Sequence, residues 1–289
     1  RMAQLQGDIL ALLGRLDEAE DVLNTTLERA KKSADELIQA EILSSMADVS
    51  RKQGDSDLSL SRHKQALKHY IARGHARWAA RTYNNIGYLL RRKNERSKAL
   101  EAYGEVEAIL AGSDDDELIN SRITLARALI SLGEVDRARE HAMASHERTA
   151  EMDDVLLHAR AQGVLGRYYS KVEQSELALF HYSEALEAMT EAGDVQSLVE
   201  ITMLLGEVLH DAGRTDEAME HYSQALVLAE ANDLRMQIGE LLTRLGGVAP
   251  DRQGRMEYLQ RALTVFRELG AKTRMREVQA MVHRAVMSR

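Results

Sequence analysis

A regular spacing of small residues constrains the fold of this chain more than any other feature of its sequence. A glycine or alanine recurs at seven positions, with steps of 40, 40, 39, 40, 40 and 40 residues. The seven positions are Gly7, Ala47, Gly87, Ala126, Gly166, Gly206 and Gly246. Self-similarity at one fixed period is typical of solenoids, in which each repeat packs against its neighbours. We therefore expect a solenoid.

The stretch Leu165–Gly193 indicates what one repeat contains. Its first half places three residues on one helical stripe, and its second half places three more on another. The first stripe is Leu165, Gly166 and Tyr169, and the second is Ala178, Tyr182 and Ala185. Because Gly166 has no side chain, a second helix can approach closely there, and Tyr182 fills the gap beside it. One repeat is therefore predicted to be a helix-turn-helix unit.

Glycines also mark the turns between the two helices of four repeats. They are Gly14, Gly54, Gly133 and Gly213, and glycine readily takes the left-handed conformation that ends a helix. Ser113 with Asp116 resembles a capping box that begins repeat four. Repeat two is the weakest copy, with His63 where an aromatic residue is expected. In repeat seven, Gly247 and Pro250 are predicted to end the first helix early.

The L-G-x-x-Y and A-x-x-x-Y-x-x-A spacing of Leu165–Gly193 resembles the tetratricopeptide repeat (TPR). The resemblance covers residues 1 to about 270, although the common repeat has only about 34 residues. Forty-residue versions are similar to those of kinesin light chains, Pins-type mitotic adaptors, and bacterial regulators such as the Rap phosphatases and the MalT activator. HEAT or armadillo repeats have a similar period without this spacing, and they are the alternative architecture. The resemblance implies an all-α fold, a right-handed superhelix (α-solenoid) of about seven helix pairs.

We divide the chain after residue 271. Residues 1–271 are expected to form seven tetratricopeptide-like repeats, and residues 272–289 a C-terminal capping helix. The apolar side of that helix is predicted to hold Met275, Val278, Met281 and Val282, and its other face Arg274, Arg276 and Arg284. A terminal helix with one polar face would cover the apolar side of the last repeat.

The amino-acid composition limits which classes of function this chain can have. The 289 residues include no cysteine, 44% are apolar, and the net charge is −8. The lack of cysteine excludes disulfides and favours a cytoplasmic location, and no apolar run is long enough to cross a membrane. The negative charge argues against general nucleic-acid binding, because phosphate contacts need an excess of Lys and Arg. The chain starts inside a helical pattern without Met, so we expect a fragment of a longer protein.

No motif in the sequence predicts catalysis. Phosphate-binding loops, nucleophile elbows and zinc-protease motifs are absent, and the S-x-x-K match at Ser61–Lys64 is short enough to arise by chance. The ten histidines are scattered, and His141 and His146 are five apart, which does not place them on one helix face for a metal. We expect ordinary surface or boundary histidines. The sequence predicts no enzyme, no cofactor and no metal site.

The resemblance implies a concave groove lined by the first helices of successive repeats. In similar proteins five positions of each first helix face that groove, and helical geometry places them on one stripe. In repeats two to five, nine of these twenty positions are Lys or Arg, whereas 38 such residues in 289 predict between two and three. Repeat six reverses the sign, with Glu200, Glu207 and Asp211. An otherwise acidic chain is therefore expected to carry a basic inner wall.

The candidate peptide-binding residues come from this stripe. They are Arg51, Lys52, Arg81, Asn84, Tyr88, Arg91, Arg92, Arg127, Arg160, Arg167 and Lys171. Arginine offers paired donors to carboxylates and phosphates, and Asn84 would supply an amide for a peptide backbone, as asparagines do in similar repeats. Alternatively, these cations pair with neighbouring acids or are solvated, and such surface pairs stabilise by only about 0–1 kcal/mol.

These features predict a protein–protein interaction module that binds a peptide or protein segment in a basic concave groove. The sign of the groove suits an acidic, phosphorylated or C-terminal carboxylate ligand. The alternative is a sensory or regulatory TPR domain of a larger bacterial signalling or transcription protein, which would control another domain through peptide binding or dimerisation. The expected partners are proteins or peptides, with acidic ones first, and neither nucleic acid nor membrane. A homodimer stays open.

Overall fold

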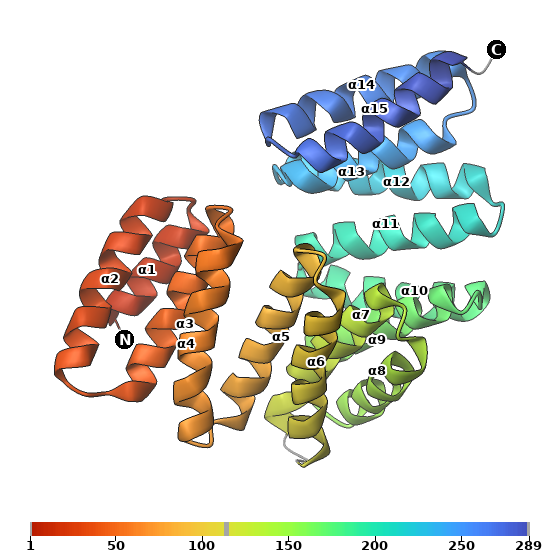
Figure 1. Cartoon of the computed structure of the whole chain (residues 1–289). Coiled ribbons are helices and arrows are strands. Elements are labelled where there is room, and N and C mark those ends of the chain that lie inside the picture. The colour runs from red at the N-terminus through yellow and green to blue at the C-terminus, as the bar shows by residue number, and fades with distance from the viewer. Residues whose placement is uncertain (1, 113–115, 288–289) are drawn as a thin grey trace. The chain divides into compact units, whose positions relative to one another are not determined.

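The computed structural model describes residues 2–112 and 116–287 of the chain. Within these residues there are fifteen α-helices, one short 3-10 helix and no strand (Figure 1). The expected all-α solenoid architecture of helix pairs is confirmed. None of the described helices combines the length and hydropathy that a membrane crossing needs. The capping box expected at Ser113 lies outside the described residues.

The chain forms two compact units, Arg1–Leu132 and Gly133–Arg289. The first unit contains α1 (Met2–Leu12), α2 (Leu16–Lys32), α3 (Glu36–Lys52), α4 (Ser56–Ala72), α5 (Ala76–Arg92), α6 (Arg96–Ala111), the 3-10 helix η1 (Asp116–Leu118) and α7 (Ile119–Leu132). The pairs α1–α2, α3–α4 and α5–α6 are the hairpins of repeats one to three, and α7 is the first helix of repeat four. The first helices α1, α3, α5 and α7 form one layer, which we call the inner face of this unit.

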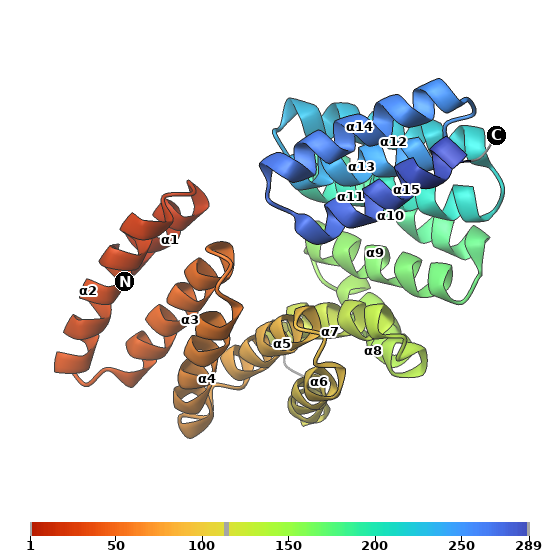
Figure 2. The same ribbon diagram turned by 45° about the horizontal axis from the view of Figure 1, so that its top comes forward.

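The second unit begins with the second helix of repeat four. It contains α8 (Val135–Ala150), α9 (Val155–Lys171), α10 (Ser175–Ala192), α11 (Val195–Asp211), α12 (Thr215–Ala231), α13 (Arg235–Val248), α14 (Arg252–Glu268) and α15 (Lys272–Met287). The pairs α9–α10, α11–α12 and α13–α14 stack as hairpins, and α15 follows the last of them (Figure 2).

The helix pairs pack in the register that the small residues predict. A Cβ atom added at Gly166 would lie 2.6 Å from Cδ1 of Tyr182, which is closer than side chains approach one another. The same relation joins Gly87 to Tyr103 across α5 and α6, at 2.5 Å from Cε1. The aromatic ring therefore occupies the volume that a side chain on the first helix would need, and glycine is what allows the contact.

The turns and the shortened repeat also follow the prediction. The four turn glycines all have positive φ, with values from 76° to 88°: Gly14, Gly54, Gly133 and Gly213. Helix α13 ends at Val248, two residues before Pro250, and has 14 residues where most first helices have 17. Proline cannot continue a helix, so the chain leaves the helical path there.

Helix α15 lies with its apolar side on the last hairpin. Val278 is 1% exposed, and Met275, Met281 and Val282 are half-buried against a cluster that includes Phe266. The arginines of its other face lie outside this contact, and Arg274 pairs with Glu240 of α13. The predicted two-sided character of this helix is therefore present in the structure.

Candidate functional site

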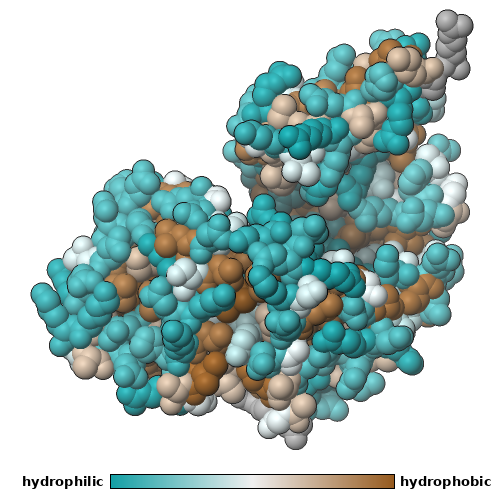
Figure 3. All heavy atoms as spheres, in the orientation of Figure 1, coloured by the Kyte–Doolittle hydropathy of each residue, from teal (hydrophilic) through white to brown (hydrophobic). Residues whose placement is uncertain are grey.

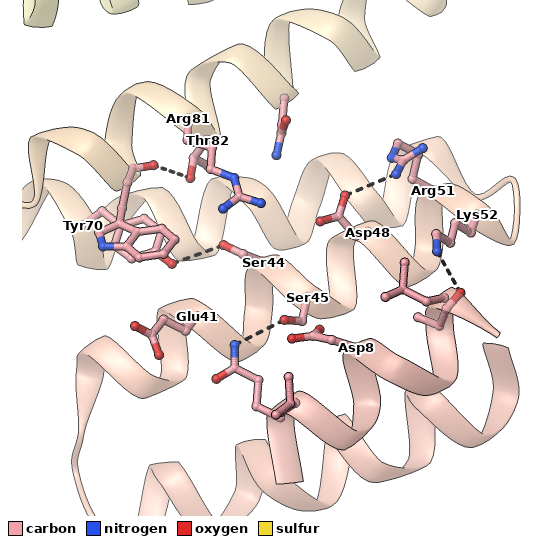
Figure 4. A pocket seen from close by; sticks show the side chains of 16 residues that line it. Asp8, Glu41, Ser44, Ser45, Asp48, Arg51, Lys52, Tyr70, Arg81 and Thr82 are labelled. Carbon is pink, nitrogen blue, oxygen red and sulfur yellow. Dashed lines mark hydrogen bonds and ion pairs between the residues drawn. The ribbon is translucent and has the colours of Figure 1, made fainter. Parts of the chain in front are cut away.

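A cleft of about 710 Å³ opens on the inner face of the first unit. Helices α1, α3 and α5 line it, and Tyr70 of α4 closes one end (Figure 4). First helices of neighbouring repeats lie side by side in this layer, and short or polar side chains at their contacts leave space between the longer ones. Gln4, Ser44, Ser45 and Thr82 are such residues. We call this space the cleft.

Charged residues of both signs line the cleft in equal number. The acids are Asp8, Glu41 and Asp48, and the bases are Arg51, Lys52 and Arg81. In Figure 4 Arg81 points into the cleft from α5, while Asp48 and Asp8 approach from α3 and α1. The cleft is therefore charge-balanced, which differs from the basic wall expected from repeats two to five. The difference arises because Glu41 and Asp48 of α3 face the same space as the bases, and α1 adds Asp8 and no base.

Two of the cleft bases already have partners within the unit. Nη2 of Arg51 lies 3.5 Å from Oδ1 of Asp48, and Nζ of Lys52 donates to the carbonyl of Ala11 at 2.7 Å. Burial raises the pKa of Asp8, and nearby Asp48 adds to that shift, whereas a hydrogen bond with Ser45 and the charge of Arg81 oppose it. Arg81 makes no ion pair with a described residue, so it is the base best placed to meet an anion.

An aromatic pair forms one end of the cleft. Trp78, the only tryptophan in the chain, stacks on Tyr70 with ring centroids 6.0 Å apart. The guanidinium carbons of Arg77 and Arg81 lie 5.7 Å and 5.8 Å from the Trp78 ring centroid, within cation–π range. Leu5 and Leu12 add exposed apolar surface from α1. The cleft can therefore hold an apolar side chain as well as charged ones.

A second group of basic residues lies on α5 and α7, beyond the residues that line the cleft. The guanidinium carbons of Arg91 and Arg92 lie 5.6 Å and 5.9 Å from the ring centroid of Tyr88. Burial raises the pKa of Tyr103, and the charges of Arg91 and Arg127 oppose that shift, so both guanidinium groups act on one phenol. Arg91, Arg92 and Arg127 form no ion pair with any residue that the structure describes. We call these three residues the α5–α7 bases.

Asn84 lies in the contact between α5 and α7. It is 4% exposed, and its Nδ2 donates to the carbonyl of Ser121 at 3.0 Å. Its Oδ1 is buried and has no hydrogen-bond partner among the described residues. The side-chain amide of Asn84, which was expected to bind a peptide backbone, instead uses its nitrogen to join α5 to α7. Only its Oδ1 is left to accept a hydrogen bond from another donor.

Three of the eleven candidate residues belong to the second unit. Arg167 of α9 pairs with Glu200 of α11. Arg160 and Lys171 are exposed and make no ion pair within the described part of the chain. A second inter-repeat pair joins Nε of Arg244 to Glu207 at 2.7 Å. An acid of repeat six therefore neutralises Arg167, as the alternative of pairing with neighbouring acids predicts, whereas Arg160 and Lys171 have no such pair among the described residues.

Several histidines are buried, so the expectation of surface or boundary histidines is wrong for them. His63 is 1% exposed, and neither ring nitrogen has a hydrogen-bond partner in the described structure. It occupies the position of Tyr103 one repeat later, where the side chain must face the first helix. Burial lowers the pKa of His63 to about 4, although the charge of Asp48 opposes the shift. Among the described residues, no group of acids and histidines is arranged to hold a metal ion.

Asp8, Trp78 and Tyr70 line the cleft but are not among the residues predicted from the sequence. The predicted inner-face positions belong to repeats two to six, although Asp8 directly follows Gly7, the recurring small residue of repeat one. Trp78 was detectable as the single tryptophan, two residues after the start of α5. Tyr70 lies on α4, the second helix of repeat two, and only the packing of α4 against α5 brings it to the inner face.

Sequence profiles of the tetratricopeptide repeat match four segments of the chain: residues 1–72 and 38–111, which overlap, then 120–142 and 202–236. No curated protein sequence matches the chain. The structure is similar to BtubC (BKLC) from P. vanneervenii, with a TM-score of 0.62 and 21% identity over 75% of this chain and 92% of that one. Identity at this level shows a shared fold only.

Two further solved structures are similar over most of this chain. One is a STAND signal-transduction ATPase with a tetratricopeptide repeat sensor from Pyrococcus horikoshii, with a TM-score of 0.59 and 17% identity; the match covers 91% of this chain but 42% of that one. The other is a Rap protein in complex with Competence and Sporulation Factor, with a TM-score of 0.60 and 14% identity over 98% of this chain and 85% of that one. These likenesses again concern the fold.

Proposed function

This chain belongs to the tetratricopeptide repeat family, and from that premise we propose that it is a protein-interaction module that holds an extended peptide segment on the inner face of its first unit. The single observation that carries this proposal is the cleft between α1, α3 and α5. It brings charged, polar and aromatic side chains from three repeats to one concave site. Sites that bind ligands combine such an apolar surface with a few placed polar groups.

The dimensions of the cleft suit a short extended segment. Packed helices lie about 10 Å apart, so three first helices span about 20 Å, which about six extended residues can cross. At one end of the cleft, Trp78 and Tyr70 offer flat surfaces to an apolar or aromatic side chain. At the opposite end Arg51 and Lys52 stand near the last turn of α3.

The charges of the inner face favour a peptide that carries acidic residues next to the apolar side chain that packs on Trp78 and Tyr70. Arg81 is the unpaired base inside the cleft, and the α5–α7 bases lie further along the same layer of first helices. Like charges on one face repel one another, and an acidic, phosphorylated or carboxylate-bearing ligand would relieve that repulsion. The acids of the cleft oppose a ligand that is negative along its whole length. We therefore propose a segment with an apolar anchor followed by acidic residues.

A peptide-display selection tests this proposal. The whole chain would be immobilised and presented with random ten-residue peptides, and the peptides that bind would be synthesised with a fluorescent label. Their affinities for the wild type would then be compared with those for Arg81→Glu and for Arg29→Glu, which changes an exposed base on α2. We expect Arg81→Glu to weaken binding at least about tenfold, the effect of about 1.4 kcal/mol, and Arg29→Glu to leave it unchanged. Equal affinities in all three proteins would contradict a site in the cleft.

A regulatory role is the second candidate. The similarity to a STAND protein with a tetratricopeptide repeat sensor favours it, because that sensor belongs to a larger signalling protein. In this version peptide binding or dimerisation would control another domain. The profiles that match describe a repeat that generally serves as a non-catalytic scaffold, and no catalytic family is among them. The cytoplasm is the proposed setting, which the lack of cysteine favours.

If the protein forms a homodimer, we propose that α1 of one copy packs against α1 of the other. Met2, Leu5 and Leu12 are 87%, 56% and 78% exposed, so this helix presents apolar side chains to solvent. The side of the molecule seen in Figure 3 is otherwise mostly hydrophilic, with apolar atoms in separate patches. Light scattering of the wild type against Leu12→Gln would show whether this helix mediates dimerisation.

A further inference from the structure

Three imidazole rings meet inside the second unit, each from a different helix. The rings of His146 on α8 and His158 on α9 stack with centroids 5.0 Å apart. The ring of His181 on α10 meets His146 edge-on at 5.8 Å and lies parallel to Tyr169 at 5.2 Å. We call His146, His158 and His181 the imidazole cluster. It joins the first helix of this unit to the α9–α10 hairpin.

A hydrogen-bond relay sets where the protons of two rings lie. The hydroxyl of Thr149 donates to the carbonyl of Ser145 at 2.8 Å, so it accepts from Nδ1–H of His158 at 3.0 Å. Nε2 of His158 in turn accepts from the amide nitrogen of Gln162 at 3.3 Å. The amide oxygen of Gln162 accepts from Nδ1–H of His181 at 2.5 Å. The bond from Gln162 requires a neutral His158, because a second proton on that ring would point at the amide hydrogens of Gln162, whereas the two bonds donated by Nδ1–H do not depend on it.

The surroundings of the cluster offer little charge to hold a proton there. The facing acids are Glu147 on α8 and, around a cavity of about 230 Å³ beside His158, Glu184, Glu187 and Glu191 on α10. All four are exposed, so solvent screens them. On α9 the facing groups are Gln162 and Tyr169, which are uncharged.

Burial lowers the pKa of His146 below the ordinary value of 6.5, and the neighbouring ring of His158 lowers it further, against the opposing charge of Glu147. Burial and His146 likewise lower the pKa of His181. A histidine whose pKa is lower in the packed state than in the open state stabilises the packed state at pH values above its ordinary pKa. That stabilisation is lost as the pH falls from the ordinary pKa through the lowered pKa. Of the common side chains, histidine is the one that titrates in this range.

We propose that the imidazole cluster is a proton-sensitive latch that fastens α8 to the α9–α10 hairpin and releases it on acidification. A proton on His158 breaks its bond with Gln162, and a proton on any of the three rings places a cation against a neighbouring imidazole. A second proton would set two like charges about 5 Å apart in a partly buried place. Opening the α8 contact separates these charges, because His146 moves away with that helix. The second unit would then lose its first helix as a packed element.

Later repeats of the same chain contain the apolar version of this contact. Leu186 and Leu226 occupy the position of His146 in repeats five and six, and Leu198 and Ile238 occupy the position of His158. Leu186 and Leu198 belong to one hydrophobic cluster, as do Leu226 and Ile238 to another. The fold therefore tolerates leucine at both positions, so His146→Leu with His158→Leu is a matched variant without the titratable pair.

Hydrogen exchange of the whole chain tests the latch. Protection factors of the α8 amides, corrected for the intrinsic effect of pH, would be compared at pH 7.5 and pH 5.5. In the wild type we expect α8 to lose about tenfold or more in protection, and α12 to lose much less. The variant His146→Leu/His158→Leu should keep its α8 protection at both pH values, whereas the exposed control His210→Leu should behave as wild type.

Two results would overturn the latch. One is α8 protection that does not change with pH in the wild type, and the other is a loss that persists unchanged in the leucine variant. If the double variant does not fold, His146→Leu alone serves, because it removes the middle ring and leaves the Gln162 relay in place. In that protein the acid-induced loss in α8 must disappear, and its persistence would equally exclude the proposal.

Discussion

The ring of Tyr222 on α12 fills the space beside Gly206 on α11, where an added Cβ atom would lie 2.6 Å from Cε1 of the tyrosine. Because Tyr222 is 2% exposed and packed on all sides, its ring cannot move aside to make room. Gly206→Leu should therefore destabilise the protein by about 1–3 kcal/mol, the usual effect of overpacking. Urea unfolding followed by circular dichroism measures this change. Gly104 is the control, because an added Cβ there meets nothing within 4 Å, and Gly104→Ala should stabilise helix α6 by about 0.5–1 kcal/mol.

A nearly buried ion pair in the first unit gives a second prediction. The guanidinium of Arg62 on α4 binds the carboxylate of Glu20 on α2, with Nη1 at 3.0 Å from Oε2, and it also donates to Ser50 of α3. The side chains are only 11% and 20% exposed. Glu20→Ala would leave a buried cation without its partner, so we expect a loss of about 3 kcal/mol in unfolding free energy. The exposed pair of Arg15 and Glu18 is the comparison, and Glu18→Ala should leave the unfolding free energy nearly unchanged because solvent screens that pair.

The burial of His63 predicts a dependence of stability on pH. Its pKa is lowered from 6.5 to about 4, so the unfolded chain binds the proton more tightly than the folded one. Its stabilising contribution is therefore complete above pH 6.5 and is lost as the pH falls towards 4, by up to about 3 kcal/mol. His63→Leu, which copies Leu23 at the equivalent position of repeat one, should flatten this dependence. Urea melts at pH 7 and pH 4.5 measure it, and an equal pH slope in both proteins would contradict the assignment.

Removal of α15 gives a fourth prediction, which concerns its proposed role as a cap. Val278, Met281 and Val282 of this helix cover the cluster around Phe266 and Leu245. A chain that ends at residue 271 would expose that cluster, so we expect it to aggregate or dimerise. Multi-angle light scattering distinguishes these states from a monomer. A monodisperse monomer with unchanged thermal stability would mean that α15 does not act as a cap.

The repeat register could be predicted from the sequence because its determinants are local. Gly166 and Tyr182 lie 16 residues apart on two consecutive helices, and the same spacing returns in Gly206 and Tyr222. A contact within one hairpin depends only on the residues of that hairpin. The pattern read in one repeat therefore predicts the same contact in the other repeats that share it. The early end of α13 before Pro250 was predictable for the same reason, since proline acts on its own helix.

The composition of the site could not be predicted in the same way, because it depends on contacts between repeats. Asn84 lies on the expected stripe, but the neighbouring helix α7 buries it through the carbonyl of Ser121. The charge balance of the cleft requires Asp8, which comes from another repeat than Arg81. The imidazole cluster draws on three helices, and the positions of its histidines share no helical spacing. The residues on one face of a helix do not show which helix of an adjacent repeat packs on that face.

The proposal that the cleft holds a peptide segment can be tested most directly by the fluorescence of Trp78. This residue is the only tryptophan of the chain and lines the cleft, so the emission of the whole protein reports on that site. A displayed peptide that binds should shift or quench this emission in a saturable titration. The midpoint should match the affinity measured from the label on the peptide, and Arg81→Glu should move both midpoints together to higher concentration. Binding that saturates on the peptide label while Trp78 emission stays constant, in the wild type and in Arg81→Glu alike, would contradict the account.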